Sequence, residues 1–275
     1  MKPIDFDAHY AEFAEQWIRE NMAKYKTIDE MEQHLPEIYL RFMNQSADWL
    51  SGKTPAEYFA QFTDADELVA LLCEYEKEDI DVPDLLLERI VDMGAGASDP
   101  LIKLAADESQ KESLRITAIN LLIEMVSDQA LPLCLSIVDT RDEYDATADV
   151  AADYISAQGQ SAVSPMLDKL PDATNAALRT YLDLLCNFPG DERIYTYTAA
   201  QFLRDTEHRA LYASYLGKLG DERALPLLRQ ALTLSDLNYL DYIEIRNAIE
   251  RISGEVITDS RSFEGDPYYE SARNA

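Results

Sequence analysis

The feature that most constrains this 275-residue chain is a phrase that returns at a nearly constant interval. Its clearest copy, "GDERALPLLRQAL", places Pro226 at the start of a run whose apolar residues recur at helical spacing. Upstream copies are anchored at intervals of 30, 31, 33 and 32 residues, and a further step back leads near Leu68. A period in this range is typical of stacked supersecondary units. The upstream anchors are Thr196, Pro165, Pro132 and Pro100.

Each period divides into two predicted helices. The first begins near the anchor, where a proline in the opening turn costs no intrahelical hydrogen bond. The second follows a polar break, as in "RALYASYLGKLG". Gly220 suits a helix end that turns left-handed, and Asp221 can cap the next helix. The tetrapeptide "GDER", found at residues 190–193 and 220–223, is therefore interpreted as a hinge between repeats rather than a catalytic acid–base group.

The segment "RALYASYLGKLGDERALPLL" resembles the short bacterial HEAT repeat that also occurs in phycobilisome-lyase-type proteins. The likeness covers roughly residues 64 to 254, is strongest in the last two units, and is degenerate after Pro132. It implies an all-α fold, an α-solenoid (superhelix) of HEAT-like helix pairs. It also implies an arginine at the start of each second helix. These arginines either pair with aspartates of neighbouring repeats, which forms a structural ladder along the stack, or line a groove that binds acidic ligands. The ladder positions are Arg115, Asp172, Arg179, Arg209 and Arg246.

Three regions follow from this reading of the chain. Residues 1–62 do not fit the period and are predicted to form an N-terminal helical cap, with the aromatic residues of "FDAHYAEFAEQW" on one helix face. Residues 63–254 are the predicted HEAT-like repeats. Residues 255–275 are predicted to be an irregular acidic tail, whose Phe263, Tyr268 and Tyr269 dock onto the repeats or offer a short motif to another protein.

The charge balance restricts the partners. The chain holds 24 basic and 52 acidic residues, a net charge of −28. This excess repels nucleic acid and anionic membranes, so direct binding to either is not expected. No run of eighteen apolar residues predicts a membrane span, and three widely spaced cysteines in apolar runs fit reduced thiols. We therefore expect a cytoplasmic protein.

No catalytic motif, metal site or cofactor site is predicted. The three histidines lie far apart in sequence and none has a neighbour at metal-ligand spacing. The acidic run "DTRDEYDATAD" lacks the glycine and the terminal glutamate of a calcium loop. The "GKT" at residues 52–54 lacks the preceding glycine of a phosphate loop, so Thr54 is interpreted as a helix N-cap.

The predicted function is non-catalytic: a scaffold that binds a protein or peptide on the concave face of the solenoid, with a basic partner favoured by the charge. Two alternatives stay open, an enzyme, cofactor lyase or chaperone of the bilin-lyase-like HEAT type, and an acidic inhibitor that mimics nucleic acid. The sequence leaves the oligomeric state open. The predicted concave-face residues are Asn120, Tyr154, Asp183, Ser214, Tyr215 and Glu250.

Overall fold

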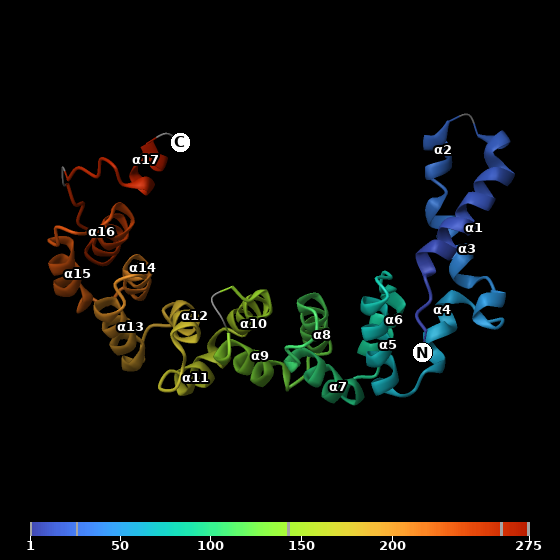
Figure 1. Cartoon of the computed structure of the whole chain (residues 1–275), viewed down its shortest axis with the longest axis horizontal. Helices are drawn as coiled ribbons and strands as arrows, with labels where there is room; N and C mark the ends of the chain where they lie inside the picture. The colour runs from blue at the N-terminus through green and yellow to red at the C-terminus, as the bar shows by residue number, and fades with distance from the viewer. Residues whose placement is uncertain (1, 26, 142–143, 259–260, 274–275) are drawn as a thin grey trace. The chain divides into compact units, whose positions relative to one another are not determined.

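The computed structural model describes residues 2–25, 27–141, 144–258 and 261–273, and within these ranges the chain is helical with no strand (Figure 1). The all-α prediction is confirmed for this part of the chain. No helix in the described ranges combines the length and apolar character that crossing a bilayer requires. The chain divides into two compact units, Met1–Leu133 and Cys134–Ala275, with the boundary inside helix α9 (Ala130–Asp139).

The first unit begins with an aromatic helical hairpin. Asp5 caps its first helix by accepting a hydrogen bond from the Ala8 amide at 2.8 Å. The predicted aromatic face packs inward, where the Phe13 ring lies 5.7 Å from that of Phe42. The helix break between α2 and α3 falls just before Pro36, which stands in the first turn of α3. The elements are α1 (Phe6–Asn21), η1 (Met22–Lys24), α2 (Ile28–Glu32), α3 (Leu35–Asn44), η2 (Asp48–Leu50), α4 (Pro55–Tyr58) and η3 (Phe59–Gln61).

Two helix pairs complete the first unit. Within and between the pairs, α5 packs on α6 and α7, and α8 packs on α6 and α7. The N-terminal segment is fastened to these helices by the buried Tyr75, whose hydroxyl donates to the Ile4 carbonyl at 2.8 Å. Arg89 donates to the Phe62 carbonyl at 2.8 Å. The pairs are α5 (Ala65–Lys77) with α6 (Asp84–Asp92) and α7 (Ala95–Ala106) with α8 (Glu112–Glu124).

The second unit continues the alternation of helices. Helix α12 packs on α11 and α13, α14 packs on α13 and α16, and α15 packs on α16. The sequence anchors fall in α7, α9, α11, α13 and α15, so each period holds one helix with the anchor and one without. The remaining elements are α10 (Ala146–Ala157), α11 (Gln160–Lys169), α12 (Asn175–Leu185), α13 (Glu192–Arg204), α14 (Arg209–Leu219), α15 (Ala224–Leu232), α16 (Tyr239–Ser253) and α17 (Pro267–Arg273).

Two anchor prolines lie deeper in their helices than the sequence predicted. Pro132 and Pro226 fall in the first turn of α9 and α15, but Pro100 and Pro165 lie inside α7 and α11. Both of these helices begin with a tight turn in which residue i bonds to i−3, as in the 2.9 Å bond from the Ala97 amide to the Gly94 carbonyl. The extra turn precedes the proline, so the expectation of a helix start at these anchors was wrong by about one turn.

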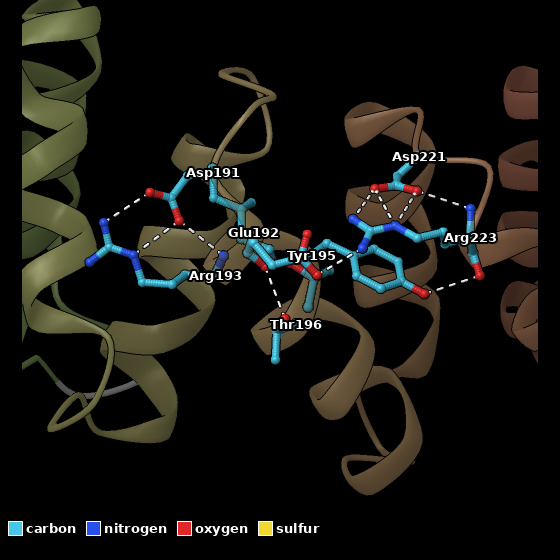
Figure 2. Close-up of polar contacts among 9 residues, drawn as sticks. Asp191, Glu192, Arg193, Tyr195, Thr196, Asp221 and Arg223 are labelled. Carbon is cyan, nitrogen blue, oxygen red and sulfur yellow. Dashed lines mark hydrogen bonds and ion pairs between the residues drawn. The ribbon is translucent and has the colours of Figure 1, made fainter.

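Both "GDER" segments act as helix boundaries (Figure 2). Gly220 ends α14 with φ 70°, the left-handed conformation that was predicted. Asp221 and Asp191 each accept a hydrogen bond at 2.9 Å from the amide of the arginine two residues later, and Asp191 is the N-cap of α13. The Arg223 guanidinium pairs with Glu192 at 2.7 Å, which joins the two copies. Gly220 and the first-copy Asp191 thus take the predicted positions, but the prediction for Asp221 was wrong. The N-cap of α15 is Arg223, which makes no side-chain capping hydrogen bond, because α15 begins only after its "GDER", whereas α13 begins at the glutamate of its copy.

The C-terminal segment folds back on the last helix pair. Phe263 is buried, with its ring 4.9 Å from that of Tyr242. Asp266 accepts a hydrogen bond from the Tyr239 amide at 2.9 Å, at the start of α16. Arg261 donates to the Leu232 carbonyl at 2.8 Å, at the end of α15. Docking is thus the observed arrangement in the described part of the tail, which also contains the unexpected helix α17. Asp259, Ser260, Asn274 and Ala275 lie outside the described residues.

Candidate binding groove of the second unit

The candidate site is a groove across three second helices, α10, α12 and α14. Two of these helices are fixed at their starts by side-chain caps: Asp145 accepts from the Ala148 amide at 3.0 Å, and Thr174 accepts from the Ala177 amide at 3.2 Å. Each helix buries one apolar stripe, including Ile155 on α10 and Leu182 on α12. The polar residues beside these stripes are therefore held at the surface on rigid backbone.

The groove has a volume of about 550 Å³ and is polar along most of its wall. Small residues such as Ala152 and Ala176 lie among the charged ones, which leaves room for another backbone to approach. Its lining is Arg141, Asp149, Ala152, Asp153, Ser156, Ala176, Arg179, Thr180, Asp183, Leu184, Asn187, Tyr215 and Lys218.

The cations of the groove are engaged by neighbouring helices. Arg141, whose side chain is only 11% exposed, donates to Thr180 Oγ1 on α12 and to Asp149 on α10, both at 2.8 Å. Lys218 on α14 pairs with Asp183 on α12. These contacts tie the three helices together and neutralise two of the three acidic residues in the groove.

The third acidic residue is Asp153. It is exposed on α10, and no hydrogen bond or ion pair within the described part of the chain engages its carboxylate. The amide nitrogen of Asn187, nearby on α12, donates to the carbonyls of Asp183 and Leu184 at 3.1 and 3.0 Å. Its side-chain oxygen accepts no hydrogen bond from the described residues. The groove thus presents acceptors whose hydrogen-bonding capacity the fold does not use.

Tyr215 forms an apolar element of the wall. It is 5% exposed, and the Lys218 ammonium lies 5.7 Å from its ring centroid. Burial raises the pKa of Tyr215, and the Asp183 carboxylate raises that pKa further. The phenol therefore stays neutral, and its buried ring supports the wall of the groove from below rather than acting as an ionisable group.

The predicted concave-face residues are distributed unevenly. Asp183 and Tyr215 both line the groove, together with Arg179. Tyr154 and Ser214 are half-buried on α10 and α14 outside its lining. Glu250 on α16 accepts a hydrogen bond from the Ile257 amide at 2.9 Å, so it holds the C-terminal segment. Asn120 lies on α8, in the other unit.

The predicted arginine ladder is present at one step. Arg209 of α14 lies 4.0 Å from Asp241, which is buried near the start of α16 and also accepts from the Ala210 amide at 2.9 Å. Burial raises the pKa of Asp241, while Arg209 lowers it. The predicted ladder aspartate Asp172 does not take this role, because it is exposed and forms no ion pair among the described residues.

The other two predicted ladder arginines have local partners. Arg115 donates to the Ala105 carbonyl at 2.9 Å, which joins α8 to α7. Arg246 lies 3.7 Å from Glu250, one turn later on the same helix. Neither guanidinium pairs with an aspartate of a neighbouring repeat in the contacts observed.

No group of three or more histidine, cysteine, aspartate or glutamate side chains that could hold a metal ion occurs in the described residues. Two residues of the acidic run proposed as an inter-helix turn, Asp142 and Glu143, lie outside that description. At "GKT", Thr54 precedes the four-residue helix α4 and donates its hydroxyl to the Glu57 carboxylate at 3.0 Å.

Of the groove lining, sequence reasoning named only Arg179, Asp183 and Tyr215. The polar residues that it missed include Arg141, Asp149, Asp153, Thr180, Asn187 and Lys218. Asp149 and Asp153 are four residues apart on α10, and Asp183 and Asn187 have the same spacing on α12. This spacing places each pair on one helix face and was a usable signal. The contacts across helices could not be read in this way.

Comparison with known proteins does not add a relative: no family model matches the chain, and no curated protein matches it. The likeness to HEAT repeats therefore rests on the residues themselves.

Proposed function

We propose that the chain is a non-catalytic interaction protein of the HEAT-like solenoid type, with residues 63–254 as its repeats and residues 1–62 as a helical cap. Its groove across α10, α12 and α14 binds a protein segment that carries a basic side chain. The observation that carries the proposal is the free Asp153 carboxylate in a groove of about 550 Å³ built on rigid helices.

The chemistry of the wall suits an extended peptide. Asp153 can accept a charge-assisted hydrogen bond from lysine or arginine. The side-chain oxygen of Asn187 offers an acceptor of the kind that orients a peptide backbone. The Thr180 hydroxyl, in contrast, is already engaged by Arg141 and by the Ala176 carbonyl. The net charge of −28 attracts a basic partner over a distance comparable with the Debye length, about 8 Å at physiological ionic strength.

The test compares two charge reversals that change the net charge equally. Asp153→Lys places an ammonium in the groove beside Arg141 and Lys218. Asp172→Lys makes the same change in an exposed turn outside the groove lining. Tagged full-length proteins are used to capture partners from cells of the source organism, and circular dichroism checks that both variants stay folded.

We expect one or more proteins to bind the wild type and Asp172→Lys and to be lost with Asp153→Lys. A basic segment of such a partner, made as a peptide, should bind the wild type more weakly as salt rises. Equal binding to both variants would refute the groove as the site. Recovery of a nuclease or another nucleic-acid-binding protein on the wild type and on both variants alike would instead favour the acidic mimic.

A further inference from the structure

The first unit contains a second, smaller cavity that the proposed groove does not use. It has a volume of about 140 Å³ and is formed by α1, α3 and the segment that leads into α6. This volume suits one side chain or one small organic group rather than a helix. The lining is Phe6, Asp7, Tyr10, Tyr39, Phe42, Met43, Val82, Pro83, Asp84 and Leu85.

Aromatic rings form one side of the cavity. Tyr10 and Tyr39 meet edge to face, with centroids 5.3 Å apart and planes at 86°. Phe42 lies behind them, its centroid 5.4 Å from that of Tyr10. Tyr39 is 46% exposed, which is unusual for a tyrosine packed beside other rings. Its exposure keeps ring surface accessible from solvent, and ring faces carry the negative end of the aromatic quadrupole.

Two carboxylates also line the cavity. Asp7 lies in the first turn of α1 and Asp84 in the first turn of α6, so elements far apart in sequence each contribute one. Both residues are exposed, and within the described residues neither carboxylate takes part in a hydrogen bond or ion pair. Position in a first turn explains why each acid stabilises its helix. It does not explain why both share one cavity with an exposed tyrosine.

We propose that this cavity binds an organic cation, an ammonium or guanidinium group whose methyl or methylene carbons contact the rings of Tyr10 and Tyr39. Ring faces and carboxylates both attract such a group, and the apolar wall of Val82, Pro83 and Leu85 accepts its carbon atoms. A metal ion is the less suitable ligand, because Asp7 and Asp84 are the only carboxylates of the lining and no group of three or more possible metal ligands occurs among the described residues. The cation is either a lysine or arginine side chain of a partner or a free quaternary ammonium.

The test uses ligand-observed NMR titrations with the full-length chain. Choline is compared with 3,3-dimethylbutan-1-ol, a neutral molecule of the same shape. We expect choline to bind more tightly, by roughly 2- to 30-fold, because only the charged member interacts with the ring quadrupole. Blocked lysine and blocked arginine form the second arm: their binding assigns the site to a partner side chain, and binding of choline alone assigns it to a free quaternary ammonium.

Matched variants separate the cavity from the general charge of the protein. Tyr39→Leu should weaken binding, whereas Tyr39→Phe should retain it because the ring remains. Asp84→Asn should also weaken binding, and Asp92→Asn, which removes the same charge from the exposed last turn of α6, should not. The proposal is overturned if the alcohol binds as tightly as choline, if Tyr39→Leu or Asp84→Asn behaves like its control, or if no cation binds.

Discussion

Gly217 offers the sharpest test of how closely two helices approach in the second unit. It lies in α14, where a Cβ atom added to it would be 3.0 Å from Ala248 Cα and 3.1 Å from Ala248 Cβ on α16. Optimal carbon–carbon contacts fall at about 3.5–4.0 Å. Gly217→Ala therefore inserts a methyl group where no space exists, against backbone that cannot rotate away.

Two opposing effects set the size of the change. Replacing glycine by alanine inside a helix ordinarily stabilises it by about 1 kcal/mol. Overpacking a fitted contact costs about 1–3 kcal/mol. Because the nearest atom is a backbone Cα rather than the end of a flexible side chain, we expect a steric cost in the upper part of that range, about 2–3 kcal/mol, and hence a net loss of about 1–2 kcal/mol.

Urea denaturation followed by far-UV circular dichroism measures this loss as a lower midpoint at an unchanged slope. Tryptophan emission is unsuitable, because Trp17 and Trp49 are the only tryptophans and both lie in the first unit. The control is Gly96→Ala in α7, where an added Cβ meets nothing within 4 Å and no destabilisation is expected. If Gly217→Ala is as stable as the wild type or as Gly96→Ala, the close approach of α14 and α16 is wrong.

Two further outcomes are expected. Tyr181→Phe should lower the free energy of unfolding by about 1–3 kcal/mol, since it removes the donor that serves the Leu135 carbonyl at 2.9 Å and Asp139 at 2.8 Å. Tyr212→Phe should cost less, because among the described residues that buried hydroxyl makes no well-formed hydrogen bond and the Arg179 guanidinium only approaches it. Equal losses in urea melts would contradict this reasoning. The pKa of Asp191 is lowered to about 2, mainly by the hydrogen bond from the Arg193 side chain and to a smaller extent by the one from the Arg193 amide. Between about pH 4 and pH 2 the unfolded chain therefore binds more protons than the folded chain. The stabilisation from Asp191 is present above about pH 4 and is lost as pH falls toward 2. Asp191→Asn should therefore make the free energy of unfolding less dependent on pH in this range. An unchanged pH dependence would refute a role for the Asp191 carboxylate.

The helical architecture was predictable because its signals are local. Apolar spacing, the left-handed Gly220 and the capping Asp191 each act within a few residues. The depth of Pro100 and Pro165 in their helices was not predictable, since the tight turn that precedes each proline leaves no mark in the apolar pattern. The repeated phrase thus predicts the period more reliably than it predicts the residue at which each helix begins.

The groove was predictable only in part, for a different reason. Asp183 and Tyr215 were inferred from their place on second helices, but the contacts that shape the groove join residues far apart in sequence. Lys218 pairs with Asp183 across 35 residues, and Arg141 donates to Thr180 across 39. Which long side chain reaches which carboxylate depends on the spacing of packed helices, and helix periodicity carries no information about that spacing.

Charge arithmetic explains why each candidate site holds a carboxylate that no basic side chain of the described residues pairs with, although the groove lining as a whole has three cations and three carboxylates. With 24 basic residues against 52 acidic ones, at least 28 carboxylates would lack a basic partner even if every lysine and arginine paired once. Arg193 and Arg223 each pair with the aspartate two residues earlier in the chain. Two of the 24 basic residues are thus engaged within the "GDER" segments themselves. Asp153 in the groove and Asp7 and Asp84 in the smaller cavity are members of this surplus. A basic partner that neutralises these carboxylates is attracted by the electrostatic field of the protein, and salt screens that field. Rising ionic strength should therefore lower the association rate far more than it raises the dissociation rate.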